Sequence, residues 1–300
     1  MISAARSPTG DSEALRTKVA ADKLPFMSAS YAEVLTDPKQ SPYNFVVAPT
    51  YSDQMRVALN WIAKEAGGHA EVAVFHNDSP FGTAPVADGE KWIADKGLDL
   101  GYQAYPMPKT PNFVGLLSQA KSQGAKYIVI QNVSSPAAQV AKDIKAQQLD
   151  MKIVCLNWCA DELFIKTAGA ENAEGHILIQ PFAPASADKP GNKEVEDYLK
   201  AKGSSLADKG VHYTQGSYTM AVMVKGIEQA IKNGGDLTGE GIRKVLECRR
   251  WPTGSSRRGS TRPRSRRRIW PRCRCCPRTN SFSTSRRTPR SAACSPPARG

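Results

Sequence analysis

The last 52 residues of this sequence contain no lysine, aspartate or glutamate. They carry 16 arginines, and this single stretch supplies all of the net charge of +13. Residues 1–248 hold 25 basic against 28 acidic residues, a net charge of −3. The body of the chain is therefore mildly acidic, and the basic overall composition does not by itself indicate a nucleic-acid-binding protein.

Two interpretations of the tail, residues 248–300, remain open. It is either a basic arm that neutralises phosphates, with an affinity that falls steeply with salt, or an out-of-frame segment. We favour the second, because Arg, Pro, Ser, Ala, Gly and Cys are what GC-rich codons yield out of frame. The change from Lys to Arg is also abrupt at Cys248, within a run that still predicts a helix. We expect a disordered tail; a single intact reading frame through codon 248 would contradict the frameshift.

Other absences exclude further classes of protein. No run of 18 apolar residues exists, so no membrane span is expected. Residues 1–6 have one basic residue and no apolar run, so no signal peptide is expected in this chain. Before Cys248 the chain has only Cys155 and Cys159, whose C-x3-C spacing suits neither a thioredoxin-type pair nor a zinc site. We expect two buried thiols, no metal and no cofactor.

Enzyme motifs are also missing. The sequence has no G-x-S-x-G, no P-loop, no G-x-G-x-x-G after a strand and no H-E-x-x-H. The four histidines are scattered. Asp161-Glu162 could form an acid–base pair, but adjacent carboxylates at a helix start more often complement the helix dipole. The protein is therefore not expected to be an enzyme.

What the body does contain is a regular alternation of short apolar runs and amphipathic stretches. The runs read as strands buried on both faces, and this alternation predicts a parallel sheet with right-handed crossovers. Ser79-Pro80, Thr110-Pro111 and Ser135-Pro136 have the form of helix starts. From residue 51 we predict helix 51–66, strand 71–76, helix 80–96, strand 99–105, helix 111–123, strand 126–131, helix 135–148, strand 152–156, helix 160–168 and strand 175–181. Helix 11–21 and strands 24–28 and 45–48 precede this unit, and only helices near 191–202, 212–233 and 238–247 follow it.

Polar and aromatic residues cluster where the predicted strands end. Open α/β sheets bind ligands at the carboxyl edge of their strands, so these loops are candidates for a binding site. Ordinary helix-capping loops are the alternative. The clusters are residues 8–12 and 28–31 upstream, and 76–82, 132–136 and 157–162 within the main unit.

At these residues the chain resembles type I periplasmic substrate-binding proteins of branched-chain amino acid (leucine/isoleucine/valine-type) ABC transporters. Val74–Gly82 resembles their strand followed by D-x-x-(Y/F)-G, and Phe45–Gln54 resembles their "F-R-x-x-P-x-D-x-x-Q" crossover. The resemblance covers roughly residues 9–247. Three shorter matches are Leu24–Ser28, Thr110–Phe113 and Ala173–Gly175.

The resemblance implies an α/β fold of two lobes, each a doubly wound, mostly parallel sheet, that close on a ligand like a hinged clamp. It implies a partial lobe 1 in residues 1–49, lobe 2 in 50–183 and a return to lobe 1, as helices only, in 184–247. Compared with the family, lobe 1 would be incomplete, and one hypothesis is that this copy is defective in binding.

Six ligand-binding residues follow from the resemblance by position. Thr9, Gly10 and Ser30 would hold the carboxylate and amino groups of an amino acid from lobe 1. Phe81 would pack on the ligand from lobe 2, and Ser134 would make a second contact there. Asn157 stands where leucine binders of this kind have a glutamate that faces the ligand's ammonium, so a zwitterionic leucine is in doubt. Asp161 could replace that glutamate only if its loop folds inward, and Trp158 either lines the pocket or is structural.

The implied function is that of the solute-binding component of an ABC importer for an amino acid or a related small molecule. Its partners would be this ligand and the permease/ATPase complex, and it would be a periplasmic monomer that binds no nucleic acid. Two alternatives are a ligand-sensing domain of a regulator or receptor on the same fold, and nucleic-acid binding through the tail. No helix-turn-helix segment supports the first, and deletion of residues 249–300 would test the second.

Overall fold

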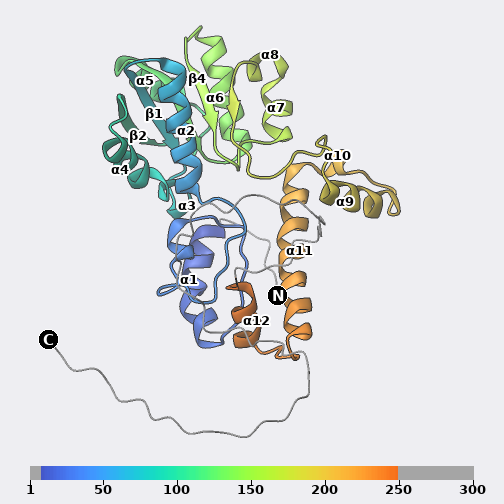
Figure 1. The fold of residues 1–300 in the computed structure, drawn as a ribbon. Coiled ribbons are helices and arrows are strands. Elements are labelled where there is room, and N and C mark those ends of the chain that lie inside the picture. Colours follow the sequence, from blue (N-terminus) through green and yellow to red (C-terminus); the bar gives the residue numbers. More distant parts are fainter. Residues whose placement is uncertain (1–7, 249–300) are drawn as a thin grey trace, which may run out of the picture. The chain divides into compact units, whose positions relative to one another are not determined.

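The computed structural model describes residues 8–248. Its centre is a five-stranded sheet in the order β2-β1-β3-β4-β5, in which all neighbours are parallel (Figure 1). The predicted α/β fold class is confirmed, whereas the interpretation of residues 249–300 lies outside the described residues. The strands are β1 (Ala70–His76), β2 (Leu100–Pro106), β3 (Ala125–Gln131), β4 (Lys152–Cys155) and β5 (Ile177–Leu178).

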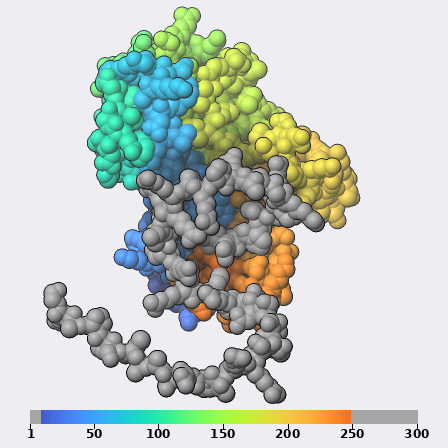
Figure 2. Space-filling model, viewed as in Figure 1, coloured from blue at the N-terminus to red at the C-terminus, as the bar shows by residue number. Residues whose placement is uncertain are grey.

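Helices cover both faces of this sheet. They are α2 (Tyr51–Ala66), α3 (Pro80–Thr83), α4 (Val86–Lys96), α5 (Val114–Ser122), α6 (Ser134–Ala146), α7 (Glu162–Ala168) and α8 (Ala170–Ala173). Because side chains alternate along a strand, each strand supplies two hydrophobic cores. Val72 and Val74 of β1 pack with α2 and α4, while Ala73 and Phe75 pack with α5, α6 and α7. Figure 2 shows α2 and α4 side by side on the outer surface.

The remaining elements are helical. They are α1 (Pro8–Ala21), the short 3-10 helix η1 (Glu33–Thr36), α9 (Pro190–Lys200), α10 (Leu206–Lys209), α11 (Val211–Lys232) and α12 (Gly239–Leu246). Within residues 8–248, no helix is both long and apolar enough to cross a membrane. Cys155 and Cys159 are buried free thiols, as the sequence predicted.

Several predicted boundaries were wrong. The helix predicted over 80–96 is divided into α3 and α4, because Pro85 has no N–H group to continue the hydrogen-bond ladder. Helix 111–123 begins at Val114, after Phe113 rather than after Thr110. The strands predicted at 24–28 and 45–48 are absent from the main sheet. Near them the structure has only an isolated parallel bridge between Phe26 and Asn44, the residue before the second run.

Smaller differences occur at three other elements. Helix α6 begins at Ser134, with Val133 as the N-cap and no capping hydroxyl, although Ser135-Pro136 had suggested one. The strand predicted over 175–181 is reduced to the two residues of β5. Helix α1 starts at Pro8, so the segment 8–10 is the first turn of a helix rather than a loop. Proline suits this first position because its φ is already helical.

The start of α2 is fixed by a capping box. The Thr50 hydroxyl accepts a hydrogen bond from the Asp53 N–H at 3.1 Å, and the Asp53 carboxylate accepts one from the Thr50 N–H at 3.2 Å. The same hydroxyl donates to Glu33 at 2.6 Å. Helix α2 leads from the segment before the sheet into the sheet unit, so this cap defines where the unit begins.

Replacing Thr50 with alanine should lower the free energy of unfolding by about 1 kcal/mol, the usual effect of losing an N-cap hydroxyl. Urea denaturation of both proteins measures the difference. Thr50→Ser keeps the hydroxyl and should remain within a few tenths of a kcal/mol of the parent protein. An equal loss in both variants would show that the methyl group, rather than the cap, is responsible.

Candidate functional site

The polar loops predicted from the sequence lie at one edge of the sheet. His76 pairs in register with Gln131, and Cys155 pairs with both Ile130 and Leu178, so the strands end close together. The loops that follow therefore share the carboxyl edge of the sheet. This is the edge at which open α/β sheets bind ligands.

Tyr51, the first residue of α2, lies at the centre of a buried aromatic cluster beside these loops. Its hydroxyl accepts a hydrogen bond from the Trp158 indole N–H at 2.9 Å. The Thr9 and Ser30 hydroxyls also hydrogen-bond to it and to each other, with 2.8 Å between their oxygens. Burial raises the pKa of Tyr51 despite these hydrogen bonds, so its phenol stays protonated. The Phe81 ring packs edge-on against Tyr51, with 5.4 Å between centroids.

A second network begins at Asp161, the N-cap of α7. One carboxylate oxygen of Asp161 accepts a hydrogen bond from the Phe164 N–H at 2.8 Å and caps this helix. The other accepts hydrogen bonds from the Ser134 hydroxyl at 2.6 Å and from Nε2 of His212 at 2.9 Å. The predicted role of Asp161 in complementing a helix start is confirmed. Its two oxygens are committed to these partners, and the loop leaves Asp161 in the cap instead of turning it toward a ligand.

The neighbouring Glu162 makes a related contact. Its two carboxylate oxygens accept hydrogen bonds from the Val211 N–H, at 3.2 and 3.1 Å, at the start of α11. The two adjacent carboxylates therefore attach α7 to the first turn of α11, one through a side chain and one through the backbone. A negative charge at a helix N-terminus is favourable, so Glu162 also stabilises α11.

The pKa values of His212 and Asp161 shift in opposite directions. Burial alone would lower the pKa of His212, but its hydrogen bonds to Asp161 and Gln215 outweigh burial and raise it above the usual 6.5. Burial alone would raise the pKa of Asp161, but hydrogen bonds from His212, Ser134 and the Phe164 N–H hold it below the usual 3.8. Both shifts favour the charged forms of the two groups, an imidazolium paired with a carboxylate.

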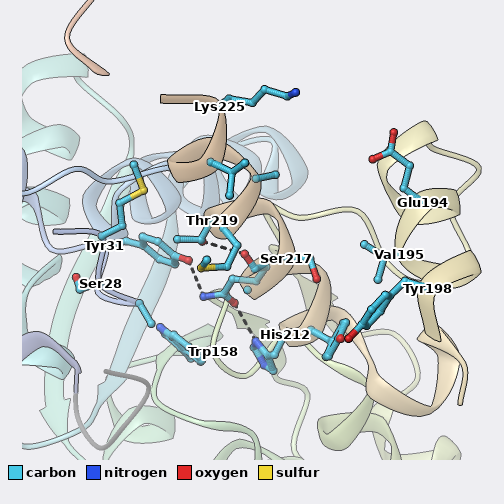
Figure 3. A pocket seen from close by; sticks show the side chains of 18 residues that line it. Ser28, Tyr31, Trp158, Glu194, Val195, Tyr198, His212, Ser217, Thr219 and Lys225 are labelled. Atoms are coloured by element: carbon cyan, nitrogen blue, oxygen red, sulfur yellow. Dashed lines mark hydrogen bonds between the residues drawn. The ribbon is translucent and has the colours of Figure 1, made fainter. Parts of the chain in front are cut away.

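A groove of about 930 Å³ lies beside this network. The indole of Trp158 and the imidazole of His212 are stacked in its wall, with 4.9 Å between ring centroids and 18° between planes. Hydrogen bonds connect Tyr31 through Gln215 to His212. Figure 3 shows Tyr31 and His212 near Trp158. The rest of the lining is mainly apolar and comes from residues 27–29, α9 and α11.

The sequence-predicted residues of lobe 1 are placed as follows. Thr9 and Ser30 are fully buried and bonded to one another, whereas Gly10 follows Thr9 in the first turn of α1 and is partly exposed. The predicted Thr9-Gly10 loop is therefore helical. None of the three lines the groove.

The predicted residues of the sheet unit are all buried, and none of them lines the groove. Phe81 is buried against Tyr51, and Ser134 is buried with its hydroxyl on Asp161. Asn157 is fully buried, and neither its amide oxygen nor its amide nitrogen has a hydrogen-bond partner. Its backbone is held by the Gln54 side chain, which accepts from the Asn157 N–H at 3.1 Å.

Sequence reasoning missed the contribution of α11. His212 is one of the four scattered histidines, and the sequence does not indicate its partner, because Asp161 is 51 positions away in the chain. Gln215 and Tyr31, which are 184 positions apart, gave no signal either. Trp158 was left open between a pocket residue and a structural one, and it lines the groove. The described residues contain no group of three or more His, Cys, Asp or Glu that could hold a metal ion.

Comparisons with known proteins agree on one family. The sequence pattern of the family described as periplasmic binding protein matches residues 4–268. A branched-chain amino acid ABC transporter protein from Thermus thermophilus, solved with bound valine, is 29% identical, with a TM-score of 0.73; the match covers 79% of this chain and 62% of that one. No curated protein matches the sequence.

Two more distant structures show the same fold. A leucine-binding protein from Thermotoga maritima is 18% identical, with a TM-score of 0.67; the match covers 81% of this chain and 67% of that one. A solute-binding protein from R. palustris in complex with 4-hydroxybenzoate is 21% identical, with a TM-score of 0.63, covering 79% and 63%. This chain thus spans about two thirds of the length of these proteins or slightly less.

Proposed function

The chain belongs to the periplasmic binding protein family, and on that premise we propose that it is the solute-binding component of an ABC importer. It binds an amino acid or a related small carboxylate and delivers it to a permease/ATPase complex in the periplasm. The family and its structural relatives are solute-binding proteins rather than enzymes. We propose the boundaries 1–49, 50–183 and 184–247 for its lobe segments, and a monomeric state.

The unpartnered amide of Asn157 carries this proposal. A buried polar group without a hydrogen bond lowers stability by about 1–3 kcal/mol, so such a group is uncommon unless it has a role. Asn157 follows β4 at the carboxyl edge of the sheet and directly precedes Trp158. An amide offers one acceptor oxygen and two N–H donors, which suits a small polar solute.

The Thr9 and Ser30 hydroxyls support a carboxylate as the other recognised group. Both can donate hydrogen bonds, and Thr9 belongs to the first turn of α1, where backbone N–H groups have no partner within the helix. Negative charge is favoured at this end of a helix. A ligand that replaces the Thr9–Ser30 contact with its own oxygens would be held by both hydroxyls.

Calorimetry with a panel of small carboxylates tests the proposal. L-valine, L-leucine and 4-hydroxybenzoate, which represent the ligands of the structural relatives, are titrated into the full chain. We expect at least one member of a panel of amino acids and aromatic acids to bind with a micromolar or lower dissociation constant. A folded protein that binds none of them would contradict the proposed function.

Asn157→Leu separates binding from folding. Leucine has a similar volume and removes the unpartnered polar atoms, so we expect the free energy of unfolding to stay level or rise. Ligand binding should weaken roughly tenfold or more, as expected for the loss of a buried polar contact. A large loss of stability with unchanged affinity would assign Asn157 a purely structural role.

A further inference from the structure

Both ring nitrogens of His212 face oxygen acceptors. Nε2 lies 2.9 Å from a carboxylate oxygen of Asp161, and Nδ1 lies 3.0 Å from the amide oxygen of Gln215. Carboxylate and amide oxygens accept hydrogen bonds and donate none. With the Gln215 amide in this orientation, the arrangement is satisfied by an imidazolium that carries a proton on each nitrogen.

The hydrogen bonds continue from His212 to the aromatic cluster. The amide nitrogen of Gln215 donates to the Tyr31 hydroxyl, and Gln215 and Tyr31 are both buried. A neutral imidazole has one N–H, so one of its nitrogens would face an oxygen lone pair. Relief requires the Gln215 amide to turn over, so that its N–H donates to His212 and its oxygen accepts from the Tyr31 hydroxyl, which reverses the hydrogen bond at Tyr31. A proton lost at His212 is thus felt at Tyr31.

The plane of His212 also supports Trp158. The two rings (Figure 3) are nearly parallel, with 4.9 Å between their centroids. The Trp158 indole N–H donates to the Tyr51 hydroxyl at 2.9 Å. A cation over the face of an indole is attracted to the ring electrons, and this attraction weakens when the cation becomes neutral. The indole therefore has two anchors, Tyr51 and the charged face of His212.

We propose that His212 is a positioning residue of the ligand site, and that its protonation controls the placement of Trp158 and thereby the affinity for the ligand. This inference rests on the proposed function, because it takes the residues around Trp158 and Asn157 as the ligand site. His212 acts through Trp158 and Gln215 and need not touch the ligand. Its imidazolium form holds α11 against the loop that carries Asn157 and Trp158.

The charged groups around His212 favour this form. Asp161 and Glu162 face it from the start of α7, while Ser134 of α6 and Gln215 of α11 add no charge. Glu194 of α9 and Lys225 of α11 also line the groove. The Lys225 side chain points away from Trp158 (Figure 3) and pairs with Glu228.

The direction of the pH dependence follows from the raised pKa of His212. In the folded protein His212 keeps its proton until the pH rises through this pKa, which lies above the ordinary 6.5, and Trp158 then loses the support of the imidazolium. The affinity for the ligand should therefore fall as the solution becomes alkaline.

Paired titrations of the full chain test the proposal. The first is nuclear magnetic resonance of protein labelled with ¹⁵N-histidine and ¹⁵N-tryptophan, with signals assigned by His212→Gln and Trp158→Phe. We expect the Trp158 indole signal to shift with the same midpoint as the His212 ring, above 6.5. The second is calorimetry with L-valine, L-leucine and 4-hydroxybenzoate, in which the affinity of the bound probe should fall roughly threefold to tenfold across that midpoint.

His212→Gln removes the titrating group, and its affinity should not change over the same pH range. His69→Gln is the matched control, because His69 is exposed between Asp99 and Glu71, and it should keep the pH dependence. Titration of His212 without a response at Trp158, or unchanged pH dependence in His212→Gln, would overturn the inference. Absence of binding by any probe at every pH would overturn the proposed function and the affinity part of the inference, while the Trp158 response still decides the link to His212.

Discussion

Replacing Asp161 with alanine is expected to lower the free energy of unfolding by about 2–4 kcal/mol. The change removes the N-cap of α7, which contributes about 1 kcal/mol, and the acceptor shared by Ser134 and His212, a loss of about 1–3 kcal/mol. The Ser134 hydroxyl keeps only its longer contact with the Trp158 carbonyl oxygen, at 3.3 Å. The Asp161 side chain thus makes hydrogen bonds to α6, α7 and α11, and its loss should weaken the packing of all three helices.

Urea denaturation at neutral pH measures this loss of stability, and two further variants serve as comparisons. Asp161→Asn keeps an oxygen for the cap and gives up the charge, so its loss should be smaller. Asp95→Ala removes an exposed carboxylate that pairs with Lys91 four residues earlier, and it should change stability by less than about 0.5 kcal/mol. If Asp161→Ala is no worse than Asp95→Ala, the network around Asp161 does not stabilise the fold.

The comparison of sequence and structure shows where local signals are sufficient. Helix α2 has the bounds predicted from the sequence, and the structure shows local caps at both ends, Thr50 at the start and Gly67, with φ of 66°, at the end. Both signals lie within a few residues of the boundary that they set. The break at Pro85 could have been read from the sequence in the same way, since proline interrupts the backbone ladder wherever it falls inside a helix.

A strand forms only beside a neighbouring strand that accepts its hydrogen bonds, and the local sequence does not identify that neighbour. The run at 24–28 has the composition of a buried strand, yet only Phe26 makes a bridge, because a strand exists only where a neighbour accepts its hydrogen bonds. The same limit applies to the site. The loops after β1, β3 and β4 were predicted because they follow strands, whereas the pairing of His212 with Asp161 results from the approach of α11 and left no pattern.

The candidate site also shows a limit of resemblance. The family pattern indicated Thr9, Ser30, Phe81 and Ser134, and the structure places these residues around Tyr51 and Trp158. It gave no account of the hydrogen bonds that connect them, which involve residues outside the pattern. Substitutions at Tyr51 or His212 should therefore affect the same functions as substitutions at the family positions.

The second large effect is expected at Gly82. A Cβ atom at this position would lie 1.8 Å from the Asn77 carbonyl oxygen and 2.5 Å from its carbonyl carbon. Both are backbone atoms, so no side-chain rotation can relieve the clash, and the loop of residues 77–82 must open. This loop carries Phe81, whose carbonyl oxygen accepts a hydrogen bond from Gln131 at 3.0 Å and whose ring packs on Tyr51.

Gly82→Ala should therefore lower the free energy of unfolding by about 3 kcal/mol, the upper end of the range for overpacking, and weaken ligand binding together with it. Gly115→Ala is the matched control. Gly115 lies in α5 with no atom within 4 Å of its added Cβ, and alanine favours a helix over glycine by about 0.5–1 kcal/mol, so this variant should gain stability. Opposite signs in urea denaturation would show that the tight approach of Gly82 to Asn77 holds the loop. A neutral Gly82→Ala would mean that the loop tolerates a wider turn and that Phe81 is not fixed by it.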